Sequence, residues 1–180
     1  VTGVQTCALP ICFVQQNPDN QLVTDKVWHE LAFGLESLGF DTPTIRRRVA
    51  EMASFFGIQD WFYKNVTELS GGQKQLLSLA SVMVMQPRVL ILDEPTNGLD
   101  IEATVEMREV ILRLAKEKGV TFLVASHLAA EIEKMCEKVL VLYEGEMLSF
   151  DTKEEALRLN PSLEDYFLAK VRDKKGSVVL

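Results

Sequence analysis

The chain has no long apolar run, no excess of positive charge and few cysteines. No run approaches the roughly 20 apolar residues that a helix needs to cross a bilayer, so we expect any membrane role to go through a partner. The net charge of −7 offers no electrostatic footprint for nucleic acid. The three cysteines, Cys7, Cys12 and Cys136, follow no metal-type or disulfide-type spacing, which argues against both kinds of site.

The chain does have enough apolar sequence for one folded core, because 47% of its 180 residues are apolar. Three runs rich in branched apolar residues predict strands: 89–92, 120–125 and 139–143. Helical patterns at 101–118 and 128–137 separate these runs. Strands that alternate with helices predict a parallel sheet with helices on both faces.

Other segments predict helices and a turn. Thr24 is expected to cap a helix that runs to about Leu38, and a second helix is expected from Thr42 to Gly57. Glu144-Gly145 predicts a hairpin turn, and a capping box at 152–155 precedes a last short helix with a frayed tail from Arg172.

Leu69-Ser70-Gly71-Gly72-Gln73 opens a helical pattern that continues to Gln86. The first N–H groups of a helix have no partner within it, and its dipole is positive at this end. Glycines let a phosphate come close to such a backbone. The segment therefore predicts an anion site at a helix N-terminus.

The apolar run from Val89 to Leu92 ends in two adjacent carboxylates, Asp93 and Glu94, followed by Pro95-Thr96. Carboxylates at the carboxyl end of a buried strand are typical of nucleotide hydrolases, in which one holds Mg²⁺ and another orients a water. The alternative is a solvated acidic pair, which is costly beside an apolar strand without a metal or hydrogen-bond donors.

Together the LSGGQ and LLDEPT sequences resemble those of an ATP-binding cassette (ABC) transporter ATPase. The resemblance implies an α/β fold of the P-loop NTPase type, with a parallel sheet flanked by helices and a helical subdomain. It implies ATP and Mg²⁺ as the bound groups. The stretch Phe13 to Leu92 is most similar to energy-coupling factor ATPases, which drive import of vitamins and transition-metal ions.

One expected part of that family is absent, since the 180 residues contain no Walker A loop of the form G-x-x-x-x-G-K-[ST]. We expect the chain to lack the N-terminal strands and this loop. Residues 1–11 resemble an in-frame translation of a sequencing adapter, so 1–12 are predicted to be an artefact. The alternative is a genuine N-terminal segment.

The resemblance assigns roles to single residues in one nucleotide site. Gln16 resembles the Q-loop glutamine, which touches Mg²⁺ or the attacking water, although Gln16-Asn17-Pro18 also fits a plain turn. Asp93 resembles the Walker B aspartate that holds Mg²⁺, and Glu94 the general base or water-orienting carboxylate. His127 resembles the switch histidine that contacts the γ-phosphate, and its alternative is a capping or loop histidine.

Further residues are assigned to the opposite nucleotide site of a dimer. Ser70, Gly71, Gly72 and Gln73 act in trans in the family, on ATP held by the Walker A loop of a second ATPase subunit. Asp100, in Asn97-Gly98-Leu99-Asp100, resembles the D-loop aspartate and can also cap the helix that follows. The chain is thus expected to keep the trans-acting half-site and to lack the phosphate cradle.

The resemblance also implies partners and a division of the chain. Transmembrane transporter subunits are the expected partners besides the second ATPase subunit, on the cytoplasmic face of the membrane, with no nucleic acid. The expected parts are a Q-loop and helical subdomain at 13–87, a core part at 88–150, and C-terminal helices and tail at 151–180.

Three alternatives stay open for function. The stretch Ser126 to Cys136 resembles ATPases of bacteriocin-type exporters, so the natural protein could be an exporter ATPase, or the sequence a chimera of the two kinds. A soluble ABC ATPase that does no transport is the second alternative. A degenerate, non-catalytic subunit is the third, although Glu94 and the LSGGQ sequence are intact.

Overall fold

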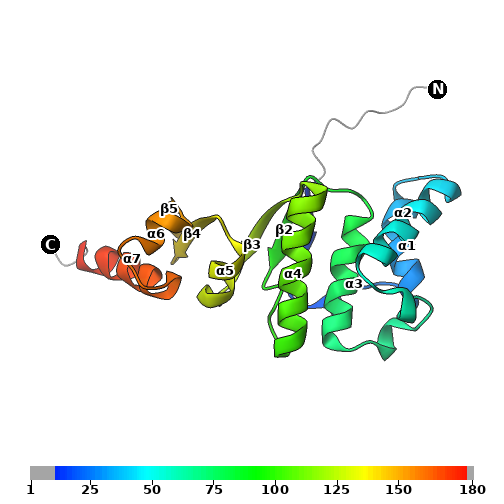
Figure 1. Cartoon of the computed structure of the whole chain (residues 1–180), viewed down its shortest axis with the longest axis horizontal. Coiled ribbons are helices and arrows are strands. Elements are labelled where there is room, and N and C mark those ends of the chain that lie inside the picture. Colours follow the sequence, from blue (N-terminus) through cyan, green and yellow to red (C-terminus); the bar gives the residue numbers. More distant parts are fainter. Residues whose placement is uncertain (1–10, 178–180) are drawn as a thin grey trace, which may run out of the picture. The chain divides into compact units, whose positions relative to one another are not determined.

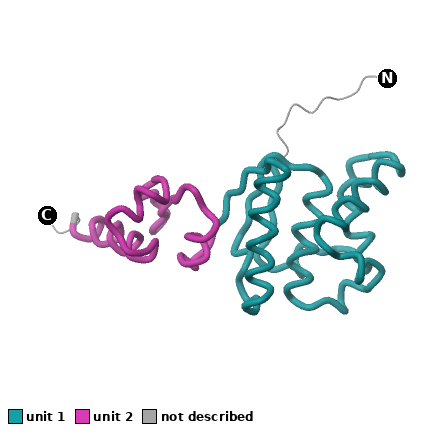
Figure 2. Tube along the Cα trace, viewed as in Figure 1, with its two compact units in different colours: residues 1–125 teal, residues 126–180 magenta. Residues whose placement is uncertain are grey.

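The computed structural model describes residues 11–177 of the chain. These residues form two compact units, the first ending at Ala125 and the second beginning at Ser126 (Figure 2).

Among residues 11–125, the first unit has a sheet of three parallel strands in the order β1-β2-β3. Their bounds are β1 Ile11–Val14, β2 Val89–Asp93 and β3 Thr121–Ala125. The central strand β2 buries Leu90 and Leu92 completely. The sequence predicted β2 and β3 but not β1, whose four residues include two from the stretch that was assigned to an artefact.

Four helices complete the first unit: α1 Val27–Ser37, α2 Thr42–Phe55, α3 Gly71–Met83 and α4 Ile101–Lys118. Figure 1 shows α3 and α4 running side by side next to the strands, with α1 and α2 beyond α3. Short 3-10 turns, η1 Pro18–Asn20, η2 Gln59–Trp61 and η3 Val66–Glu68, connect these elements. The predicted parallel sheet flanked by helices is confirmed.

The start of α1 differs from the prediction, because Thr24 does not cap it. The cap position is Lys26, which makes no side-chain cap hydrogen bond. The backbone N–H groups of Val23 and Thr24 instead donate to the carboxylate of Glu30, at 3.1 and 2.8 Å. Glu30 is only 4% exposed, so these backbone donors satisfy a carboxylate that would otherwise be buried without partners.

The second unit contains α5 Ala129–Met135, β4 Lys138–Tyr143, β5 Glu146–Thr152, α6 Lys153–Leu157 and α7 Leu163–Ser177. Its core joins Val141 of the hairpin to Ala156, Leu163 and Tyr166. The Tyr166 hydroxyl donates to the Asp151 carboxylate and accepts from the Ser149 hydroxyl, and these bonds anchor α7 on β5.

The predicted hairpin turn and the capping box at 152–155 are confirmed. Glu144 and Gly145 both have positive φ, 49° and 79°, as a two-residue hairpin turn requires. One expectation was wrong for the described residues, because α7 continues past Arg172 to Ser177, where a frayed tail was expected. Within the second unit, β4 pairs antiparallel with β5. Local turn geometry thus decides the pairing of β4.

We predict that the chain self-associates through the outer edge of β3. Within residues 11–177, β3 pairs only with β2, and Leu123 is 57% exposed, so an apolar strand presents unpaired backbone groups. The substitution Leu123→Lys should raise several-fold the concentration at which association is detected by light scattering, because charge on an edge strand opposes pairing. Leu112→Lys, at a 41% exposed leucine on helix α4, is the matched control. Equal effects of both substitutions would exclude the edge as the cause.

Candidate functional site

The carboxyl ends of β1 and β2 lie at one edge of the sheet because the two strands are parallel. Val14, the last residue of β1, is opposite Leu92, and Asp93 is opposite Ala125, the last residue of β3. Gln16 follows β1 by two residues, and Glu94 follows β2 directly. The register therefore places Gln16, Asp93 and Glu94 at the edge where nucleotide-binding α/β proteins place their ligands.

The turn after β2 holds Glu94 in an unusual conformation. Its φ of 47° is in the left-handed region, which costs a non-glycine residue on the order of 1–3 kcal/mol and persists only where neighbours fix it. The Glu94 N–H donates to the Ala125 carbonyl at 2.8 Å, and the Asn97 N–H donates to the Glu94 carbonyl at 3.0 Å. These bonds extend β2 toward β3 and fix where the half-buried Glu94 side chain leaves the backbone.

Helix α3 begins at the predicted anion site. Ser70 is the cap residue, and its hydroxyl accepts from the Gln73 N–H at 3.2 Å while the Gln73 side chain accepts from the Ser70 N–H at 3.0 Å. The N–H groups of Gly71 and Gly72 belong to the first turn, where helix geometry provides no acceptor. Apart from its chain neighbours and the backbone of its own helix, no described atom lies within 4 Å of a Cβ placed on Gly71. This open, positive helix end can accept a phosphate.

The start of α4 lies against the start of α3. Asp100 caps α4, accepting from the Ala103 N–H at 2.8 Å. The Cβ of Ala103 would be only 2.8 Å from a Cβ added to Gly72. Gly72 is therefore required for the close approach of the two helices, and Asp100 lies next to the LSGGQ segment. The capping role that the sequence allowed for Asp100 is confirmed.

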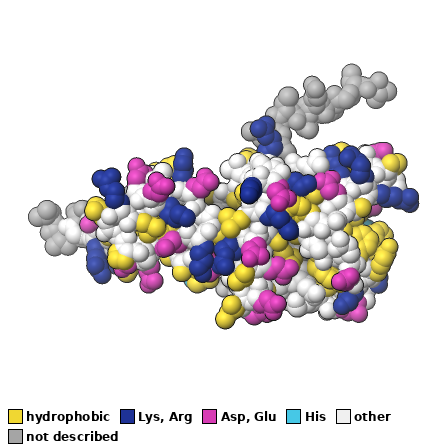
Figure 3. All heavy atoms as spheres, in the orientation of Figure 1, with side chains coloured by type: hydrophobic (Ala, Val, Ile, Leu, Met, Phe, Trp, Pro, Cys, Tyr) yellow, Lys and Arg dark blue, Asp and Glu magenta, His cyan; other side chains and the backbone are white. Residues whose placement is uncertain are grey.

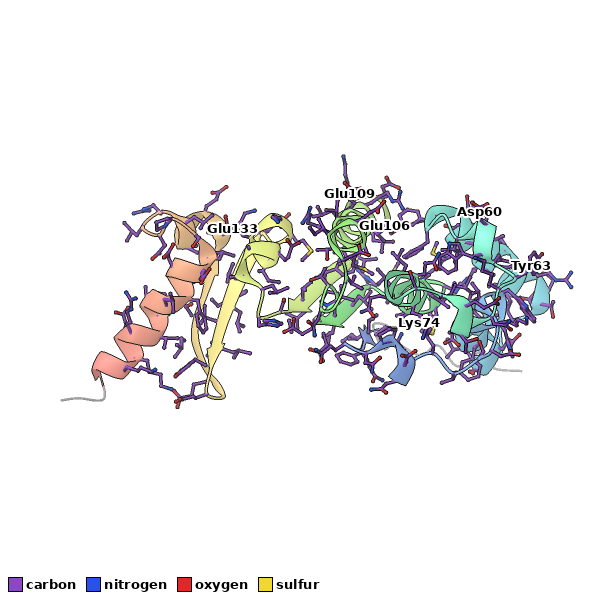
Figure 4. The ribbon with its side chains drawn as sticks, turned by 90° about the horizontal axis from the view of Figure 1, so that it is seen from below. Asp60, Tyr63, Lys74, Glu106, Glu109 and Glu133 are labelled. Atoms are coloured by element: carbon purple, nitrogen blue, oxygen red, sulfur yellow. The ribbon has the colours of Figure 1, made fainter. Side chains whose placement is uncertain are left out.

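A cavity of about 510 Å³ joins three segments that are far apart in sequence. The segment after β1, the first turns of α3 and the loop before α4 line it: Gln16, Asn17, Pro18, Asp19, Gly71, Lys74, Gln75, Asn97, Gly98 and Leu99. Of the predicted site residues, it brings together Gln16 and Gly71, and the lining does not include Asp93 or Glu94. Lys74 ion-pairs with Asp19 at 2.7 Å across it. Figure 4 shows Lys74 on the side of α3 that faces the N-terminal segment.

His127 belongs to the second unit, two residues after the end of β3. Its side chain is exposed. The neighbouring Ser126 hydroxyl accepts from the Leu128 N–H at 3.1 Å, which shapes the loop before α5.

The described residues include no group of three or more histidine, cysteine, aspartate or glutamate side chains able to hold a metal ion. Mg²⁺ commonly takes only one or two protein oxygens and completes its octahedron with water and substrate phosphate. The donors at this sheet edge, a carboxylate on Asp93 and an amide oxygen on Gln16, are hard oxygen ligands of that kind. They fit a phosphate-bound Mg²⁺.

A second cavity, of about 640 Å³, lies among α1, α2 and the segment after η2. Its lining is largely apolar and aromatic, including Trp28, Phe40, Ile45, Phe62 and Tyr63, with Glu36 and Arg46. Figure 3 shows exposed apolar side chains over this end of the first unit. Such a surface suits an apolar segment of a partner rather than a phosphate. No helix of the described residues is long and apolar enough to cross a membrane.

Comparison with known proteins identifies the family. The family model described as ABC transporter matches residues 6–97. The chain belongs to the ABC transporter family. A second model, for AAA domains, matches residues 63–133. The α/β fold predicted from the resemblance is confirmed as that of an ABC ATPase by the solved structure described next.

Three relatives show how similar this ABC ATPase chain is to known proteins. CbiO1 of Clostridium perfringens, described as part of the ABC transporter complex cbiONQ, superposes with a TM-score of 0.77 at 35% identity, covering 83% of this chain and 60% of CbiO1. The energy-coupling factor transporter ATP-binding protein EcfA of Syntrophomonas wolfei is 39% identical over 147 residues, 82% of this chain and 54% of EcfA. A "Putative ABC transporter ATP-binding protein" of Bacillus thuringiensis is 44% identical over 141 residues, 78% of this chain and 26% of that protein. The chain thus spans between 26% and 60% of these relatives.

Several residues in and near the cavity were not predicted from the sequence to belong to a site. Asp19, Gln21, Lys74 and Gln75 were not singled out, although Asp19, Lys74 and Gln75 line the cavity. The only available signal was the density of polar residues between Gln15 and Gln21. It could not indicate which helix these side chains contact.

We predict opposite effects of alanine at the two glycines of the LSGGQ segment. Gly72→Ala should lower the free energy of unfolding by about 1–3 kcal/mol, because the new methyl group overlaps Ala103 and forces α3 from α4. Gly71→Ala meets open space in the first turn of a helix and should raise that free energy by about 0.5–1 kcal/mol. Chemical denaturation of both variants measures the difference. A tolerated Gly72→Ala would mean that the helices are not in close contact.

Proposed function

We propose that this chain is part of the ATP-binding and ATP-hydrolysing subunit of an energy-coupling factor transporter that imports a vitamin or a transition-metal ion. The observation that carries the proposal is the similarity to EcfA and CbiO1, which extends over more than four fifths of the chain. The positions of the site residues support it. Asp93 and Glu94 lie at the carboxyl end of β2, and the LSGGQ segment lies at the start of α3.

The roles proposed for the residues follow from their donors and acceptors. Glu94 orients the attacking water and accepts its proton, and Asp93 and Gln16 hold Mg²⁺ by their oxygens. When bound, Mg²⁺ neutralises charge on the β and γ phosphates. His127 donates a hydrogen bond to the γ-phosphate.

The LSGGQ segment is proposed to serve ATP that is held by a second ATPase subunit. The Ser70 hydroxyl and the first N–H groups of α3, those of Gly71 and Gly72, donate to the phosphate, and Gln73 keeps the cap in place. Asp100 orients the adjoining loop at the same surface. A phosphate cradle of the Walker A form occurs nowhere in the 180 residues, so this chain alone cannot position ATP for hydrolysis.

The proposed partners are that second ATPase subunit and transmembrane transporter subunits. CbiO1 is part of the ABC transporter complex cbiONQ, which supports a partnership of this kind. The proposed location is therefore the cytoplasmic face of the membrane, as a peripheral subunit.

The catalytic role of Glu94 can be tested in a hybrid in which this chain replaces the matching residues of Syntrophomonas wolfei EcfA. Glu94→Gln should reduce Mg²⁺-dependent phosphate release by about 10²–10⁴-fold while ATP binding persists, since glutamine keeps the shape but cannot accept the proton. Glu144→Gln is a matched control, because Glu144 also has a positive φ but lies in the β4–β5 turn. The isolated 180-residue chain should release phosphate negligibly.

Two results would count against this proposal. Phosphate release by the Glu94→Gln hybrid at the unsubstituted rate would remove Glu94 from catalysis. Steady Mg²⁺-dependent release by the isolated chain, abolished by Glu94→Gln, would show that no separate phosphate cradle is needed.

A further inference from the structure

One side of helix α3 faces the segment that carries Gln16, and its contacts there are polar. The residues on this side follow helical spacing: Gly71, Lys74, Gln75 and Ser78. We call the contact between them and residues 15–21 the polar seam. A hydrogen bond within the protein replaces a hydrogen bond to water. Each of these polar contacts therefore contributes little net stability.

Gln21 makes the central contact of the polar seam. Its Oε1 accepts from the Gln15 N–H at 2.9 Å, and its Nε2 donates to the Ser78 carbonyl of α3 at 3.1 Å. One side chain thus connects the residue next to Gln16 with the interior of α3, where Ser78 is fully buried. Both polar atoms of the amide are used, which fixes the orientation of the side chain.

Two further contacts limit the movement of this segment. Asp19, in η1, ion-pairs with Lys74 at 2.7 Å. Glu30 accepts from the N–H groups of Val23 and Thr24 and so attaches the residues after Gln21 to α1. Residues 15–21 are therefore held at several points, and the two hydrogen bonds of Gln21 join the backbone beside Gln16 to α3.

The polar seam is incompletely satisfied. The Gln75 Nε2 and the Ser78 Oγ are buried and have no hydrogen-bond partner among the described atoms. A buried polar group without a partner costs about 1–3 kcal/mol, and this cost disappears when water reaches the group. The seated state of the segment is thus less stable than a fully paired contact would be, which is what a releasable contact requires.

We propose that Gln21 is a positioning residue that ties Gln16 to helix α3 through this releasable polar seam. Movement of the LSGGQ helix then moves Gln16, and release of Gln21 separates them. The proposal deepens the proposed function, because it rests on Gln16 and the start of α3 acting on nucleotide.

Amide hydrogen exchange of the 180-residue chain, followed by NMR, tests the contact without any ligand. Gln21→Met keeps the length of the side chain but removes both hydrogen bonds, so the Gln15 amide should exchange about 5- to 10-fold faster. Gln21→Glu keeps the acceptor for Gln15 and loses the donor to Ser78, so protection of Gln15 should be largely retained. Gln59→Met, at an exposed glutamine of η2, is the matched control and should leave Gln15 unchanged. Unchanged exchange at Gln15 in Gln21→Met would overturn the proposal.

A substitution at Gln75 should act in the opposite direction. Gln75→Met removes the unpaired amide while keeping the volume, so the seated state no longer bears its cost and Gln15 should exchange about 5-fold more slowly. Faster exchange in this variant would mean that Gln75 itself holds the segment down, which contradicts a releasable seam.

The positioning role is tested in the EcfA hybrid, which supplies the phosphate cradle, by the response of the Gln16 side-chain amide resonance to added Mg²⁺-ATP. We expect the Ser70–Gln73 amides to respond equally in all variants, whereas the shift of Gln16 should fall at least two-fold in Gln21→Met and Gln21→Glu and stay unchanged in Gln59→Met. A full Gln16 response in both Gln21 variants would reduce Gln21 to a structural role and overturn the proposal. If the Ser70–Gln73 amides of the unsubstituted hybrid do not respond, the nucleotide role fails instead, and the exchange rates alone decide on the contact.

Discussion

The parallel pairing of β2 with β1 and β3 is the constraint on which the candidate site depends. It brings the carboxyl ends of three strands to one edge, so residues 16, 93 and 94 leave the sheet together although up to 78 positions (94 − 16) separate them in sequence. The bond from the Glu94 N–H to the Ala125 carbonyl continues this pairing beyond β2 and holds Glu94 in its left-handed conformation. Without the register, the two carboxylates would have no fixed relation to Gln16.

The second constraint is the contact between two helix starts. Ser70 and Asp100 are both caps, and each satisfies N–H groups of its own helix. Gly72 allows α3 to approach Ala103 of α4, so the two capped ends lie next to each other. The predicted anion site at the start of α3 and the loop that carries Asp100 therefore lie on one surface. The helices can approach this closely because Gly72 has no side chain.

The segment between β1 and α1 connects these two constraints. It begins at the sheet edge with Gln15 and Gln16, rests on α3 through Asp19 and Gln21, and is attached to α1 by Glu30. Its contacts are hydrogen bonds and one ion pair, which depend on distance and angle more than apolar packing does. Polar side chains of this segment, among them Gln16 and Asp19, line the cavity, so its lining is polar.

The sequence by itself determined the local features, because they depend on neighbouring residues. Short motifs predicted the helix start at the LSGGQ segment, the Asp100 cap, the Glu144-Gly145 turn, strand β2 and the family. Only the tertiary structure decided that Ile11–Val14 forms a strand and that Gln21 reaches Ser78. These contacts join residues whose patterns carry no information about each other: four residues are too few to show a period, and a polar side chain can bond to any backbone group that the fold brings near it.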